Sequence, residues 1–217
     1  MPRLISLFLV IACCSTPGAQ EPWLPVASFA EDDGVQSSQF FGGSVSISGN
    51  QMAVGAGLWS TSQFSSEGRV FIYALDPTGQ WSLYATLPNP QPNNNDDFGR
   101  SVSLSGDWLA VGAYRADGAD SDVGKTHIYA RNAGGQWNLA TTLSEDLGVN
   151  YARFGGAVSM SGERLAVLSW NGQLASCPGC EVGTIHIYQR DSQGIWIPSE
   201  SFPNPPPLSG LGLGAAT

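Results

Sequence analysis

The chain has 217 residues, which is enough for one large β domain or two small ones. Only 12% of the residues are charged, whereas glycine (27) and proline (14) are plentiful, so the composition favours strands and turns over long surface helices. The formal net charge of −9 repels phosphate backbones and argues against a nucleic acid partner.

The N-terminal residues 1–19 have the features of a signal peptide. Arg3 is the only charge in the first 20 residues, and the apolar run Leu4–Ala12 is too short to cross a bilayer. The run continues into Val-Ile-Ala-Cys at Cys13, which resembles a bacterial lipobox, whereas ordinary cleavage near Ala19 is the alternative. We therefore expect an exported protein: either an outer-membrane or cell-surface lipoprotein anchored through Cys13 alone, or a freely secreted protein.

Residues 20–203 contain an internal repeat, the sign of a stacked-repeat architecture. A nonapeptide of the form Phe-Gly-x-Ser/Ala-Val-Ser-x-Ser-Gly begins at Phe41, Phe98 and Phe154, with offsets of 98 − 41 = 57 and 154 − 98 = 56 residues. Each copy continues with three further apolar segments. They lie at 52–56, 70–73 and 81–87 in the first copy, at 109–113, 127–129 and 137–143 in the second, and at 165–169, 186–188 and 196–202 in the third. An extra copy of the last segment, 23–29, precedes the first full repeat.

Each apolar segment has the pattern of a β-strand. Val102 and Leu104 alternate with serines, so a strand places the two apolar side chains on one face and the serines on the other. Ser-Gly pairs and Asp- or Asn-containing turns with glycine join successive strands as hairpins. Four antiparallel strands per repeat predict an all-β fold, a partial β-propeller of about three four-stranded blades (40–87, 98–143 and 154–202) plus one extra outer strand at 23–29.

A blade cannot bury both of its faces alone, so the blades are expected to stack. The phenylalanine of each Phe-Gly unit is predicted to wedge between blades, while the glycine lets two backbones approach closely. Closed propellers typically need four to eight blades, so three blades predict an incomplete ring. A piece of a longer propeller is our first interpretation, and an open arc or one part of a homo-oligomeric ring are the alternatives. Residues 204–217 have no strand pattern and are expected to form a disordered Pro/Gly-rich tail.

The motifs Phe-Gly-x-Ser-Val-Ser-Leu-Ser-Gly and Leu-Ala-Val-Gly-Ala, spaced in this way over residues 23–202, resemble the FG-GAP repeat of integrin-α-type β-propellers, most of all its bacterial secreted or surface members. The resemblance implies the propeller fold, which hosts many activities. The proline of "GAP" is absent, since Gly57, Tyr114 and Trp170 take its place. The family's calcium loop between the first two strands is replaced by a Ser-Gly turn, so its calcium ligands have no counterparts here.

One acidic loop stands out as a candidate metal site. Asp117, Asp120 and Asp122 lie within six residues, and carboxylate oxygens are the ligands that Ca²⁺ prefers. The spacing is not that of an EF-hand, and the matching loops of the other repeats lack these carboxylates. A solvated loop is the simpler interpretation, calcium is the alternative, and no other cofactor is predicted.

Cys177 and Cys180 form a Cys-Pro-Gly-Cys segment. Structural zinc needs four ligands, and redox Cys-x-x-Cys motifs usually open a helix after a strand, a pattern that is missing here. In an exported protein, a local disulfide between the two is the favoured interpretation.

No set of residues in the sequence predicts catalysis. His127 and His186 occupy one repeat position, which is Phe71 in the first repeat, so we interpret both as packing residues. The sequence shows no Ser-His-Asp set, phosphate loop or nucleotide fingerprint. We expect the acidic pairs that precede each Phe-Gly unit to have a structural or solubility role; they lie at 31–33, 96–97 and 145–146.

Three aromatic residues fall outside the repeated tryptophan position and near loops, namely Trp59, Tyr114 and Trp170. Exposed aromatic side chains at loop mouths bind partner proteins or sugars. The sequence therefore predicts a non-catalytic binding module of a secreted or surface-anchored bacterial protein, with a protein or glycan as its partner. The alternative is that the chain is a fragment or accessory propeller domain of a larger secreted protein, and an enzyme is one candidate for that larger protein.

Overall fold

The computed structural model describes residues 39–118, 121–145, 151–173 and 181–203. Several predicted features lie outside these described residues: the signal peptide and Cys13, the extra strand at 23–29, Asp120, the Cys177–Cys180 segment, and the tail at 204–217. The sequence predictions for them stay predictions.

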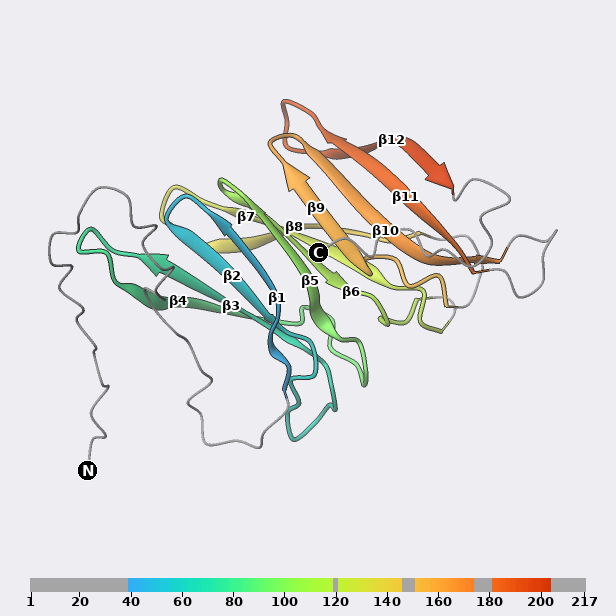
Figure 1. The fold of residues 1–217 in the computed structure, drawn as a ribbon, viewed down its shortest axis with the longest axis horizontal. Helices are drawn as coiled ribbons and strands as arrows, with labels where there is room; N and C mark the ends of the chain where they lie inside the picture. The colour runs from blue at the N-terminus through green and yellow to red at the C-terminus, as the bar shows by residue number, and fades with distance from the viewer. Residues whose placement is uncertain (1–38, 119–120, 146–150, 174–180, 204–217) are drawn as a thin grey trace, which may run out of the picture.

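The described residues form twelve strands in three antiparallel four-stranded sheets, which we call blades 1, 2 and 3 (Figure 1). Blade 1 consists of β1 (Phe41–Ser48), β2 (Gln51–Ala56), β3 (Arg69–Leu75) and β4 (Trp81–Pro88). Blade 2 consists of β5 (Phe98–Ser105), β6 (Trp108–Ala113), β7 (Lys125–Arg131) and β8 (Trp137–Leu143). Blade 3 consists of β9 (Ala157–Ser161), β10 (Arg164–Gln173), β11 (Glu181–Arg190) and β12 (Trp196–Pro203). The predicted all-β class with three four-stranded antiparallel blades is confirmed.

Within each blade the strands follow chain order, so every connection is between sheet neighbours. The β1–β2 hairpin turns at Gly49, whose φ of 59° is a left-handed conformation that glycine adopts without strain. The β3–β4 turn is held by Asp76, whose Oδ1 accepts hydrogen bonds from the amides of Thr78 (2.8 Å) and Gln80 (2.9 Å). No described segment forms a helix of the length and hydrophobicity needed to cross a membrane.

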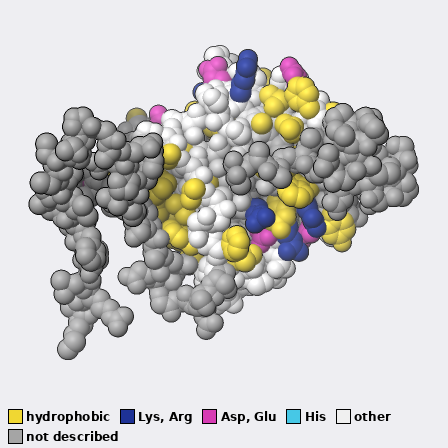
Figure 2. Space-filling view, in the orientation of Figure 1, with side chains coloured by type: hydrophobic (Ala, Val, Ile, Leu, Met, Phe, Trp, Pro, Cys, Tyr) yellow, Lys and Arg dark blue, Asp and Glu magenta, His cyan; other side chains and the backbone are white. Residues whose placement is uncertain are grey.

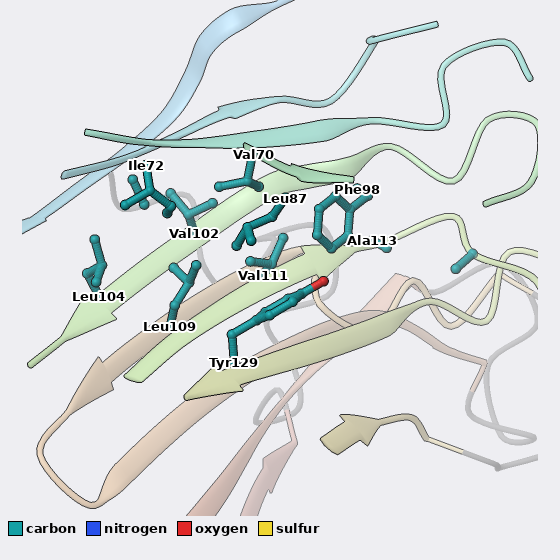
Figure 3. Packing of buried hydrophobic residues seen from close by; sticks show 12 residues of the cluster. Val70, Ile72, Leu87, Phe98, Val102, Leu104, Leu109, Val111, Ala113 and Tyr129 are labelled. Carbon is teal, nitrogen blue, oxygen red and sulfur yellow. The ribbon is translucent and has the colours of Figure 1, made fainter. Parts of the chain in front are cut away.

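The three blades stack face on face, and their main hydrophobic clusters lie between them. We call the face that a blade turns towards the preceding blade its N-side face, and the opposite face its C-side face. Between blades 1 and 2, Val70, Ile72 and Leu87 of the first C-side face meet the second N-side face, as Figure 3 shows. Phe98, and Phe154 at the next interface, have no exposed surface. The predicted wedging of these rings between blades is confirmed.

Serine side chains join the inner strands of neighbouring blades. Ser44 Oγ donates to the carbonyl of Gly99 (2.8 Å), whereas Ser46 Oγ accepts from the amide of Leu104 (2.9 Å). The same pattern recurs one blade later in the contacts of Ser101 with Gly155 (2.8 Å), Ser103 with Met160 (2.8 Å) and Ser105 with Gly162 (2.9 Å). Each interface is thus an apolar cluster bordered by hydrogen bonds from side chain to backbone.

Candidate functional site

All long connections of the described chain lie at one end of the blades, which we call the loop end (Figure 1). The loop 57–68 of blade 1 runs beside residues 89–97, which lead into blade 2. The amides of Asn95 and Asp97 donate to the carbonyls of Ser65 (2.8 Å) and Ser66 (3.0 Å). The same contacts recur between residues 121–123 and 151–154 at the next junction. The loop end is therefore an ordered surface rather than a set of independent loops.

Trp59 lies on the loop of blade 1 and is half-buried. The Arg69 guanidinium stacks over its ring at 4.4 Å from the ring centroid, and the ring of Phe71 meets it edge-on at 5.5 Å. Such a cation–π pair holds the indole in one orientation. Trp59 therefore presents a fixed, partly exposed edge at the loop end.

Tyr114 occupies the corresponding end of β6 in blade 2. The Arg100 guanidinium lies 5.4 Å from its ring centroid, and its hydroxyl is hydrogen-bonded to Asp97. Burial, followed by the charge of Asp97, raises the pKa of Tyr114, so the phenol stays neutral and acts as the donor. An arginine and an aromatic ring thus form a pair in blade 2 as they do in blade 1.

Trp170 has the same repeat position in blade 3 as Tyr114 has in blade 2, and it is 42% exposed. Its indole lies against Gly156, so closely that a β-carbon at this glycine would overlap the ring. The Trp170 amide donates to the carbonyl of Ala152 at 2.9 Å, which fixes the start of the side chain. The three predicted aromatic residues therefore all lie at the loop end, one on each blade.

The loops beneath these aromatic residues are held by buried carboxylates. Asp96 is 1% exposed, and its Oδ2 accepts from the side-chain amide of Asn89 (2.7 Å) and the backbone amide of Asn93 (2.8 Å). Asn89 also donates to the carbonyl of Glu67 at 3.2 Å. Burial raises the pKa of both Asp96 and Glu67 above the ordinary range. These acidic residues have a structural role, because their side chains are directed into the loops.

Asp97 is the most perturbed carboxyl group at this end. It is 5% exposed, and burial raises its pKa to about 6, against the opposing effects of Arg115, Tyr114 and Arg100. It also lines a cavity of about 20 Å³ at the junction of blades 1 and 2, which is about the size of one water molecule. Nothing in the sequence of the Asp-Asp pair distinguishes this buried residue from a surface one.

Basic side chains gather near the aromatic residues, where Arg100 is exposed and the others are half-buried. Five of the nine lysines and arginines of the chain lie at the loop end, namely Arg69, Arg100, Arg115, Lys125 and Arg153. Glu67, Asp96 and Asp97 are buried below them. Figure 2 shows hydrophobic, basic and acidic side chains gathered towards the loop end of blades 2 and 3.

The predicted calcium site is only partly within the described residues. Asp117 Oδ1 accepts a hydrogen bond from the amide of Asp122 at 3.0 Å. Asp122 Oδ2 lies 3.5 Å from Arg115 Nε, so its charge already has a cationic partner. Within the described residues no three His, Cys, Asp or Glu side chains are grouped so that they could hold a metal ion. Because Asp120 lies outside them, calcium binding stays a prediction.

The two repeat-position histidines have different surroundings. His127 is buried, its Nδ1 lies 2.9 Å from Thr142 Oγ1, and burial lowers its pKa to about 4. His186 Nε2 lies 3.1 Å from Ser169 Oγ and 3.2 Å from Glu145 Oε2. A serine–histidine–acid relay needs contacts at both ring nitrogens, whereas both partners here contact Nε2. The sequence does not reveal this cluster, since Glu145 and His186 lie far apart along the chain.

A repeat family and a solved structure are similar to this chain. No curated protein matches the chain. Among solved structures, the chain is similar to the periplasmic gluconolactonase PpgL of Pseudomonas aeruginosa, with 12% identity and a TM-score of 0.36. The match covers 73% of this chain and 56% of that one. The model of the FG-GAP repeat matches residues 23–73 and 81–129, so this part of the chain consists of FG-GAP repeats.

Proposed function

We propose that this chain is a non-catalytic binding module of an exported protein and that it holds a protein partner at the loop end. The observation that carries the proposal is the set of Trp59, Tyr114 and Trp170, one aromatic residue per blade, on an ordered surface. All three are at least partly exposed, and arginines cover the rings of the first two.

A protein partner suits this surface better than a glycan does. Tryptophan, tyrosine and arginine are the residue types most enriched in the energetic centres of protein interfaces. A sugar would stack on the flat face of an aromatic ring, but the Arg69 guanidinium occupies one face of Trp59 at 4.4 Å. The exposed Arg100 and the half-buried Arg69 beside these rings favour a partner segment with acidic side chains beside apolar ones.

The absence of catalysis is supported by the geometry of the one serine–histidine–acid cluster in the described residues. Ser169 is 2% exposed, and its hydroxyl shares the Nε2 atom of His186 with Glu145. A hydroxyl that is buried between strands has no access to a substrate. The cluster has the features of a packing contact that ties the residues before blade 3 to β10 and β11.

Random peptides displayed on phage and selected on the immobilised protein test the proposed surface. We expect the selected peptides to be rich in acidic and apolar residues and to lose at least about tenfold in affinity, roughly 1.4 kcal/mol, on Trp170→Ala and Tyr114→Ala. Ile197→Ala is the matched control, because Ile197 is 47% exposed but lies on β12 near the hairpin end. Peptides that bind all variants equally would place the interaction elsewhere.

A panel of purified polysaccharides in affinity electrophoresis tests the glycan alternative. Retardation of the wild type that Trp170→Ala abolishes, together with no selected peptide, would replace the protein partner by a glycan.

Export is the second part of the proposal, and it rests on the apolar run after Arg3 and on the lipobox-like ending at Cys13. Expression in a bacterium followed by membrane fractionation tests the lipid anchor. The wild type is expected in the membrane fraction, and Cys13→Ser is expected to move it to the soluble exported fraction. Equal membrane retention of both forms would refute lipidation at Cys13.

A further inference from the structure

We infer that blade 1 carries an open docking face for a further FG-GAP-type blade, and that blade 3 is shaped so that it cannot fill this face in a second copy of the chain. The two outer faces of the described stack differ from each other when each is set against the two interfaces inside it. It is independent of the loop-end partner.

The N-side face of blade 1 is apolar, and no blade formed by the described residues covers it. Val45 and Ile47 are each 63% exposed. Their counterparts in blade 2, Val102 and Leu104, are 8% and 5% exposed because the C-side face of blade 1 covers them. Figure 2 shows hydrophobic side chains gathered over blade 1. Contiguous exposed apolar surface of this kind marks an interaction site.

The backbone and rings of this face already have the conformation of the covered faces. Gly42 has a φ of 83°, and its counterparts Gly99 and Gly155 have values of 90° and 86°. The ring of Phe41 lies 5.4 Å from that of Phe71, edge-on, much as Phe98 lies 5.5 Å from the ring of His127. The face therefore needs no rearrangement to receive a blade.

The two internal interfaces define what the docking blade must offer. The first requirement is a serine that donates to the glycine carbonyl, as Ser44 and Ser101 do. The second is a glycine beside that serine, because a β-carbon on Gly55 or Gly112 would overlap the facing carbonyl oxygen. The docking partner is therefore an FG-GAP-type blade that keeps both the serine and the glycine.

Blade 3 lacks these features at matching positions. Ala157 replaces the donor serine, and Leu168 replaces the glycine. A leucine side chain here takes the space that the facing carbonyl oxygen occupies beside Gly55 and Gly112 in the internal interfaces. Glu200 stands where blade 1 has Ala85 at its interface with blade 2, and docking would bury its charge without a partner.

The rest of this C-side face is a groove rather than a smooth apolar surface. It has a volume of about 380 Å³ and polar groups from Ser159, Arg164, Gln189 and Glu200. Terminal repeats of stacked-repeat proteins carry such polar outer faces. Head-to-tail association of two copies, with blade 3 of one on blade 1 of the other, is therefore blocked by side chains of blade 3.

Restoring the missing features on blade 3 tests the inference. The variant Ala157→Ser/Leu168→Gly/Glu200→Ala is compared with the wild type by size-exclusion chromatography with light scattering over a range of concentrations. We expect the wild type to stay monomeric and the variant to form larger species as its concentration rises. Adding Ile47→Asp to the variant, which places a charge on the receiving face, is expected to return the monomer.

A matched variant tests whether position 168 must be a glycine. Ala157→Ser/Leu168→Ala/Glu200→Ala also removes the leucine side chain but keeps a β-carbon, so it is expected to stay monomeric. Cooperative thermal melting identifies which variants are folded. If Ala157→Ser/Leu168→Gly/Glu200→Ala does not fold, the experiment uses a chimera instead. In this chimera residues 154–203 are replaced by a second copy of residues 98–144.

Two results would overturn the inference. One is a folded glycine variant or chimera that stays monomeric, because blade 1 would then not accept a matching blade. The other is a wild type that associates and is dissociated by Ile47→Asp, because blade 3 would then fill the face despite Leu168.

Discussion

The carbonyl oxygen of Gly99 lies directly against the α-carbon of Gly55 across the interface of blades 1 and 2, leaving no space for a β-carbon. We therefore expect Gly55→Ala to destabilise the protein by about 3 kcal/mol or more, since overpacking against backbone cannot be relieved by a side-chain rotation. Gly57→Ala is the control, because its β-carbon would meet its nearest atoms at 3.7 Å. Urea unfolding of both variants measures the difference, and similar midpoints would contradict the close approach.

The serines between the blades are expected to matter only where a following blade is present. Ser103→Ala removes the acceptor of the Met160 amide, which costs about 1–2 kcal/mol when a buried donor loses its partner. Ser159 has the same repeat position in blade 3 but is exposed, so Ser159→Ala should change the free energy of unfolding by less than about 0.5 kcal/mol. Equal losses in the two variants would mean that the hydroxyl acts within its own blade.

Asp97 should make the protein more stable as the pH falls from about 6 to about 4. Its pKa in the folded state is about 6, above the ordinary value of 3.8, so the folded protein holds this proton more tightly than the unfolded chain does. Asp97→Asn should thus be more stable than the wild type at pH 7.5, by up to about 3 kcal/mol, and equal to it near pH 4. Melting at the two pH values tests this, with exposed Glu163→Gln as the control. A constant difference between Asp97→Asn and the wild type would contradict the raised pKa of the buried carboxyl.

His127 should act in the opposite direction. Burial lowers its pKa from 6.5 to about 4, so the unfolded chain takes up the proton first and stability falls as the pH drops between these values. His127→Phe, which installs the residue of the first repeat, should remove this loss, worth up to about 3 kcal/mol. Because the effects of Asp97 and His127 oppose each other, melting curves of the single variants against pH are needed to separate them. Parallel curves for the wild type and His127→Phe would refute the prediction.

The strands and blades could be predicted from the sequence because their signals are local and repeated. Val102 and Leu104 alternate with serines, and the phenylalanine of each repeat marks the same place, so three four-stranded sheets followed from pattern alone. The loop-end positions of Tyr114 and Trp170 followed in the same way, because both replace the proline of the repeat.

The polar contacts between blades could not be predicted, because they join residues that share no local pattern. A strand with serines on one face is typical of a solvent-exposed surface, yet Ser46 and Ser103 bond the backbone of the next blade. Asp97 belongs to an acidic pair that suggests a surface loop, and only the crossing of two loops buries it. The contact of Glu145 with His186 likewise arises only from the stacking of the blades.

The serine bonds between blades run from side chain to backbone, and this has a consequence for how such a protein can change over generations. A serine that accepts from a backbone amide, as Ser46 and Ser103 do, imposes no side-chain identity on the next blade at that point. Duplication, loss or exchange of a whole unit therefore preserves these bonds without matched substitutions next door.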